Sequence, residues 1–95
     1  MIAAALLALT FPALSVQTNA ALAAAPREVG VFIQRSVQCE HWAGEEGYDT
    51  ARRQQIDRAI RVLRCDRVEE DGRYLRRKYA NKPNLIRLLK TAPDF

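Results

Sequence analysis

The charged residues of this chain all lie after position 25. Residues 1–25 contain no Lys, Arg, Asp or Glu, whereas all 15 basic and all 11 acidic residues lie at Arg27 or beyond. Residues 2–14 form an apolar stretch, and Ala21-Leu22-Ala23 has the small-x-small pattern of a processing site. This arrangement predicts a cleavable signal segment over residues 1–23, so that residues 24–95 alone would form the folded domain.

A membrane anchor is the alternative interpretation of the same segment. A membrane-spanning helix needs roughly 20 uninterrupted apolar residues, and the polar run Gln17-Thr18-Asn19 ends the apolar stretch before that length is reached. We therefore expect a periplasmic or secreted protein with no stable membrane span after processing.

The small size of the remaining domain gives weight to its two cysteines, Cys39 and Cys65. A core this small supplies only about 3–5 kcal/mol of net stability. In an oxidising compartment, two lone cysteines most simply form a disulfide. Closing the loop between them contributes roughly 3.5 kcal/mol in the chain-entropy model. Because the two quantities are similar, we expect the reduced domain to be largely unfolded at about 37 °C.

The spacing of apolar residues predicts an all-α fold, a small bundle of three or four short helices. The first helix is expected over residues 27–41. The second is expected over residues 49–65, with Asp49 as its N-cap. The residues that form the inner stripes of these two helices are Val29, Phe32, Ile33 and Val37, followed by Ile56, Ala59, Ile60 and Leu63.

Two further helices are expected after Cys65. Asp66 and Glu69 have the spacing of a capping box, which predicts a helix over residues 67–80. Its inner stripe contains Gly72, where the lack of a side chain suits a close helix crossing. Pro83 suits the first position of a last helix that ends before Pro93. The apolar residues of these two helices are Val68, Leu75, Tyr79, Leu85, Ile86, Leu88 and Leu89.

The disulfide constrains the segment between the first two helices. A helix over residues 49–65 spans about 24 Å, so residues 39–49 must return roughly that distance for the sulfurs to meet. An extended chain of this length reaches about 33 Å. We therefore expect residues 42–48 to lie back along the second helix as an ordered strap rather than to form a tight turn.

The segment from Cys39 to Asp49 contains the densest run of distinctive residues, Cys-Glu-His-Trp-Ala-Gly-Glu-Glu-Gly-Tyr-Asp. It resembles the C-x-H-W-x-G-E-E-x-Y-D segment of a family of small exported proteobacterial proteins. The likeness continues through the arginine-rich helix, the second cysteine and the helix at Pro83, although Gly47 stands where the family usually has proline. The resemblance implies export, helices and a cysteine pair, and it implies no catalytic residue.

A looser likeness suggests an alternative function. Cys65, Asp71, Leu75 and Tyr79 are similar in order to the C…D…L…Y helix of periplasmic lysozyme inhibitors. Lysozymes are cationic, so the net charge of +4 on this chain disfavours its association with a lysozyme. A local acidic patch around residues 45–49 could offset this repulsion. The alternative function is therefore a periplasmic inhibitor of a cell-wall-degrading enzyme.

The charge pattern allows two interpretations. Opposite charges are interspersed, which favours a solvated helical surface with many ion pairs, among them Asp57 and Arg61 at i, i+4. The other interpretation is attraction to an anionic partner, because twelve of the fifteen basic residues are arginine. Export argues against nucleic acid as that partner.

No motif predicts catalysis or metal binding. His41 could ligate a metal or act as a base, but we favour a structural role in which it hydrogen-bonds a carboxylate or carbonyl and holds the strap. Glu45 and Glu46 could form an acid–base pair only at a defined separation. Ser36 has no G-x-S-x-G context. We expect no catalytic residue, no metal and no cofactor.

These observations favour a non-enzymatic exported binding or accessory protein of the bacterial cell envelope, with an envelope protein or an anionic polymer as its partner. Trp42 and Tyr48 are expected mainly to cover the disulfide and the adjacent helix face, with partner contact as the alternative. The candidate contact residues are His41, Trp42, Glu45, Glu46, Tyr48, Asp49, Arg73, Arg76 and Arg77.

Overall fold

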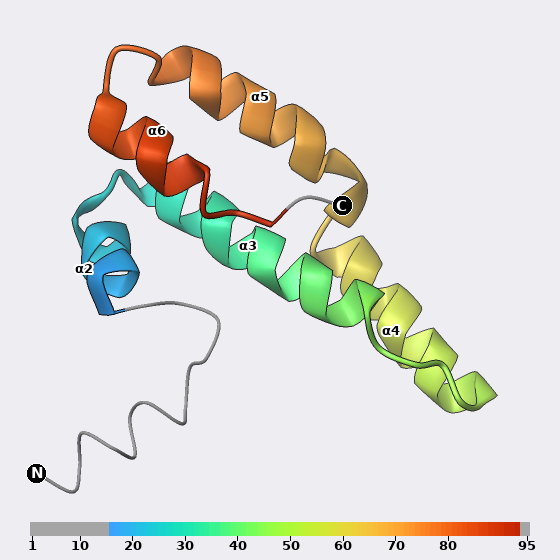
Figure 1. The fold of residues 1–95 in the computed structure, drawn as a ribbon. Coiled ribbons are helices and arrows are strands. Elements are labelled where there is room, and N and C mark those ends of the chain that lie inside the picture. The colour runs from blue at the N-terminus through green and yellow to red at the C-terminus, as the bar shows by residue number, and fades with distance from the viewer. Residues whose placement is uncertain (1–15, 94–95) are drawn as a thin grey trace, which may run out of the picture.

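The computed structural model describes residues 16–93, and this part of the chain is helical with no strand. The apolar stretch of the expected signal segment, residues 2–14, lies outside the described residues. Figure 1 shows the arrangement of the elements. The helices are α2 (Val16–Ala24), α3 (Arg27–Ala43), α4 (Thr50–Val62), α5 (Val68–Lys78) and α6 (Pro83–Leu89), with a 3₁₀ turn η1 (Cys65–Arg67) between α4 and α5. The predicted all-α class is confirmed.

Helix α3 is the central element, and α2, α4, η1, α5 and α6 all pack against it. Its inner face carries Val29, Phe32 and Ile33, which are buried as their spacing predicted. Ser36 is also fully buried, and its hydroxyl is satisfied because it donates to the Phe32 carbonyl at 2.9 Å. The other buried members of the core are Cys39 from α3, Val68 and Leu75 from α5, and Leu88 and Leu89 from α6.

Helix α2 also contacts the core. It packs against α3 and α6, and Leu22 lies against the core cluster. The expected cleavage after Ala23 therefore falls inside a helix of this structure. That cleavage stays a prediction.

The predicted disulfide is present. Cys39 and Cys65 are bonded, with their Cα atoms 5.6 Å apart. Asp49 is the N-cap of α4 as expected, because its carboxylate accepts a hydrogen bond from the Arg52 amide at 2.7 Å. The first helix ends at Ala43, two residues beyond the expected end.

The structure between α4 and α5 differs from the prediction. Helix α4 ends at Val62, before the expected end at Cys65, and Arg64 has φ 54°. This left-handed conformation stops an α-helix of L-residues. The predicted capping box is wrong, because Asp66 lies within η1 and α5 has no side-chain cap. An N-cap residue needs an extended backbone, which a residue in a helical turn does not have.

Gly72 marks the close crossing of α3 and α5 that its position suggested. A Cβ atom at this position would lie 3.0 Å from Cζ of Phe32. The Phe32 ring is buried and cannot move away freely. The packing of α5 on α3 therefore depends on the absence of a side chain at position 72.

A polar cluster joins the start of α3 to the end of α5. Glu28 accepts hydrogen bonds from Lys78 Nζ at 2.6 Å and from the Tyr79 hydroxyl at 2.5 Å. The bond from Lys78, followed by that from Tyr79, holds the pKa of the Glu28 carboxyl below its usual value. The same bond to Glu28 raises the pKa of Lys78 and that of Tyr79.

Substitution of Gly72 tests the helix crossing. We expect Gly72→Val to lower the free energy of unfolding by about 2 kcal/mol, as overpacked sites do. Gly44→Ala is the matched control: a Cβ there would have its nearest contact at 3.6 Å, so its effect should stay within about 0.5 kcal/mol. Urea denaturation measures both. Equal stabilities for the two variants would contradict the tight crossing.

The Glu28 cluster predicts an acid-dependent loss of stability. A carboxyl whose pKa is lowered on folding stabilises the fold above its ordinary value of 4.5, and this contribution is lost as the pH falls through the lowered pKa. We expect Glu28→Gln to be less stable than wild type at neutral pH and to show a smaller loss below about pH 5. Denaturation at stepped pH measures this. Glu40→Gln, at an exposed position on the same helix, should keep the wild-type profile.

Candidate functional site

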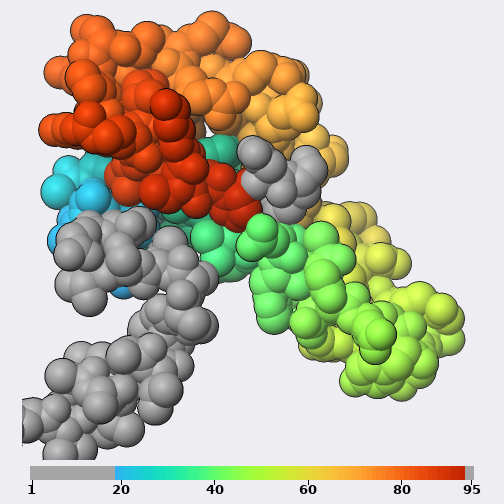
Figure 2. Space-filling model, in the orientation of Figure 1, coloured from blue at the N-terminus to red at the C-terminus, as the bar shows by residue number. Residues whose placement is uncertain are grey.

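Helix α4 and the residues before it form an arm that extends from the rest of the molecule (Figures 1 and 2). Within residues 16–93, α4 packs against α3 and η1 but not against α5 or α6. Its one buried residue is Ile56, which lies outside the core cluster. The arm therefore has little apolar burial of its own.

Residues 42 and 43 of the expected strap belong to α3, so the strap comprises residues 44–49, and Arg52 holds it against α4. One guanidinium nitrogen of Arg52 forms an ion pair with Glu45, and another donates to Gln55 at 2.6 Å. The same guanidinium lies 5.3 Å from the centroid of the Trp42 ring, within the range of a cation–π contact. Arg52 thus joins the end of α3, the middle of the strap and the first turns of α4.

Gly47 brings the strap into close contact with α4. A Cβ atom at this position would lie 2.2 Å from Cγ of Arg53, so the stem of Arg53 occupies the space of a side chain. The strap runs along α4 towards the start of that helix (Figure 1). The expected return path along the second helix is therefore confirmed.

The structure corrects the roles expected of three strap-region residues. Tyr48 is 75% exposed and covers neither the disulfide nor a helix face. Trp42 is half-buried against Arg52. His41 is exposed and lies edge-on to Trp42 at 5.4 Å between ring centroids, and its imidazole makes no hydrogen bond among the described residues. Arg52, rather than His41, holds the strap.

The acidic residues of the strap have different surroundings. Glu45 is bound by Arg52, whereas Glu46 is exposed. Asp49 serves as the N-cap of α4. In the part of the chain that the structure describes, no three His, Cys, Asp or Glu residues are grouped so that they could hold a metal ion.

The candidate residues of α5 lie apart from the strap. Arg73, Arg76 and Arg77 are exposed on α5, which does not pack against α4. Arg73 forms an ion pair with Glu69 at 2.7 Å. The expected contact surface, which joined the strap to these arginines, is therefore two separate surfaces.

Sequence reasoning missed a set of arginines on α4. The expected pair of Asp57 with Arg61 is absent from the ion pairs of residues 16–93. These ion pairs join α3 to α5, the strap to α4, and neighbours within η1 and α5. The four residues that we call the α4 arginine face are exposed and have no ion-pair partner within the described residues: Arg53, Arg58, Arg61 and Arg64.

The signal for this face was present in the sequence. At 100° per residue, Arg53, Arg58 and Arg61 fall within one half of the helix circumference, and Arg64 follows at the end of the helix. The interspersed charges favoured a surface with many ion pairs, which holds for Arg73 and Lys78 of α5 but for neither Arg76, Arg77 nor the α4 arginine face within the described residues. Only the distances between side chains separate these two cases.

Comparisons with known proteins identified no relative of this chain. The chain matches no protein-family model, no curated protein and no solved structure. None of the helices within residues 16–93 has the length and apolar character needed to cross a membrane.

Substitution of Arg52 tests how the strap is held. We expect Arg52→Ala to lower the free energy of unfolding by about 1–2 kcal/mol, since an ion pair and a cation–π contact are lost together. Trp42 is the only tryptophan, so its fluorescence emission should shift to the red as the ring becomes more exposed. Arg58→Ala removes an exposed arginine from the same helix and should leave both observables unchanged. An unchanged Trp42 spectrum in Arg52→Ala would contradict the assignment.

Proposed function

We propose that this protein is a non-enzymatic binding or accessory protein of the bacterial cell envelope that is exported after removal of its signal segment. Its α4 arginine face would bind an anionic polymer. The observation that carries the proposal is the presence of four exposed arginines on one helical arm with no acidic partner within the described residues.

The chemistry of arginine supports an anionic ligand. The guanidinium group stays protonated at any physiological pH, and its planar fork matches two oxygens of a phosphate or carboxylate. Where an arginine already has an acidic neighbour, as Arg73 has in Glu69, a ligand must compete with that neighbour. The α4 arginine face is free of this competition.

The contacts that hold the two ends of the arm also support a binding role. The disulfide at Cys65 anchors the end of α4, and the strap holds its start through Arg52. Groups that are ordered before binding lose less conformational entropy when a ligand arrives. A ligand would therefore meet an arm whose backbone is already held at both ends.

Arg64 adds a further indication. A non-glycine residue in the left-handed region costs about 1–2 kcal/mol, and glycine would remove this cost at φ 54°. Strained residues of this kind concentrate at functional sites. The arginine at this position extends the charged face beyond the end of α4.

The alternative of a lysozyme inhibitor has less support from the geometry. Two of the acidic residues that could contact a cationic lysozyme already form ion pairs within the chain, because Asp71 is paired with Arg35 at 2.6 Å and Glu45 with Arg52. Glu46 remains exposed. A stoichiometric complex with a muramidase that slows hydrolysis of the cell wall would favour this alternative over the polymer.

A pair of double variants tests the α4 arginine face. We expect Arg58→Gln with Arg61→Gln to weaken binding to an immobilised anionic polysaccharide or polyphosphate by about tenfold or more, since charged hydrogen bonds contribute about 1.5–3 kcal/mol each. Arg76→Gln with Arg77→Gln removes the same charge from α5 and should change the affinity less than about threefold. The complex should dissociate near 0.5 M salt, where the Debye length is roughly 4 Å.

Two outcomes would contradict the proposal. Equal weakening by the α4 and α5 double variants would mean that the net charge acts without a defined site. Failure of the wild-type protein to bind either polymer would remove the polymer as its ligand.

A further inference from the structure

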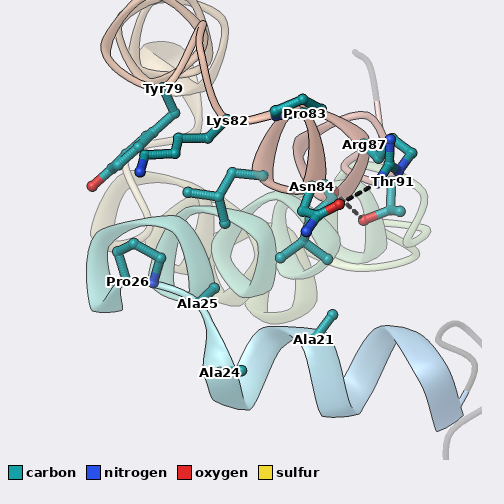
Figure 3. Close-up of a pocket in the computed structure, with 12 residues that line it drawn as sticks. Ala21, Ala24, Ala25, Pro26, Tyr79, Lys82, Pro83, Asn84, Arg87 and Thr91 are labelled. Atoms are coloured by element: carbon teal, nitrogen blue, oxygen red, sulfur yellow. Dashed lines mark hydrogen bonds between the residues drawn. The ribbon is translucent and has the colours of Figure 1, made fainter.

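A second candidate site lies on other elements, between the end of α2 and helix α6 (Figure 3). It is a groove with a volume of about 830 Å³, within the range of about 300–1,000 Å³ that is typical of ligand pockets. The groove is lined by Ala21, Ala24, Ala25, Pro26, Tyr79, Lys82, Pro83, Asn84, Leu85, Arg87, Leu88 and Thr91. It is distinct from the α4 arginine face and does not depend on the function proposed for that face.

The wall of the groove is mainly apolar. Alanines of α2 and Pro26 lie on one side (Figure 3), and α6 contributes Leu85 and Leu88 to the lining. Ile86 and Leu89 pack with Leu88 against the core, but Leu85 is half-buried outside the core cluster. Helix α6 therefore carries more apolar surface than the core uses, and the excess faces the groove.

The polar residues of the groove have one sign of charge. Lys82 and Arg87 line it, both are exposed, and no acidic residue lines it. Neither cation has an ion-pair partner within the described residues, although Arg87 donates to the side chain of Asn84. The Tyr79 hydroxyl is already engaged with Glu28. An apolar trough with free cations at its edge complements an anionic head group joined to an apolar tail.

We propose that this groove binds a single-chain anionic amphiphile of the fatty-acid type. The acyl chain lies against Ala25, Pro26 and Leu85, and Lys82 contacts the carboxylate. A second copy of the chain fits less well, because it would bring its own Lys82 and Arg87 against these cations. Removal of residues 1–23 would take away α2 up to Ala23 and with it one wall of the groove, so the groove belongs to the chain that retains α2.

The test compares decanoate with decanol, its uncharged counterpart, on the full chain of residues 1–95, with retention of residues 1–23 checked by intact mass. Titration followed by NMR should show decanoate shifting the amide signals of residues 24 and 25, 79–82 and 84–91. Decanol should bind at the same residues but more weakly. Binding of the two compounds with equal affinity would overturn the assignment of Lys82 to the head group.

Single substitutions distinguish binding in this groove from a non-specific effect of net charge. Lys82→Gln should weaken decanoate binding about tenfold and leave decanol binding unchanged. Lys90→Gln removes an exposed cation from the C-cap of α6, outside the groove lining, and should change neither affinity. Leu85→Asn should weaken both compounds.

The remaining outcomes also decide the proposal. Equal loss of decanoate binding in Lys82→Gln and Lys90→Gln would overturn it, as would the absence of any decanoate binding to the wild-type protein. The double variant of Arg58 and Arg61 should bind decanoate as wild type does. A loss of binding there would place the amphiphile on the α4 arginine face instead.

Discussion

The covalent bond between Cys39 and Cys65 determines where the second half of the chain can lie. Cys39 is buried in the core on α3, so the bond holds η1 against that helix and directs α5 back across it. Helix α4 depends on this bond most, because Ile56 is its only buried residue. Without the covalent anchor, the strap and its contacts with Arg52 would have to hold the arm alone. The apolar burial of α5 and α6 on α3 stabilises the rest of the fold together with this bond, since Cys39 is part of the same core cluster.

The distribution of ion pairs gives the two ends of the molecule different chemistry. On α5, Arg73 pairs with Glu69, and Asp71 with Arg35, whereas the exposed Arg76 and Arg77 have no ion pair within the described residues. On α4, Arg52 pairs with Glu45, whereas the four residues of the α4 arginine face have no ion pair within the same part of the chain. Near α6 the free cations border an apolar groove instead. The same residue types therefore favour a polymeric anion at one surface and an anionic amphiphile at the other.

The local features predicted correctly are those that depend on neighbours along the chain. The stripe of Val29, Phe32 and Ile33 is buried, and Asp49 caps α4. The capping box at Asp66 failed because the same spacing occurs in a 3₁₀ turn, where the chain is already helical. The strap was predicted from the reach of the chain, since a disulfide between known positions restricts the possible paths. His41 was assigned the structural role that Arg52 performs, because spacing alone does not identify which polar side chain reaches Trp42.

The sequence by itself determined the helical class, the cysteine pair and the buried residues Val29, Phe32 and Ile33 of α3, because helical periodicity and cysteine count do not depend on how the elements pack. Of the inner stripe expected on the second helix, only Ile56 is buried, and it lies outside the core cluster. Only the tertiary structure decided which charges have partners and which apolar residues face solvent. Glu45 meets Arg52 and Arg35 meets Asp71 because packing brings separate segments together. The four residues of the α4 arginine face have no ion pair within the described residues, although Asp57 lies on the same helix and the acidic strap runs along it. Electrostatic compensation depends on distances in space, so the candidate binding surfaces became visible only in the folded chain.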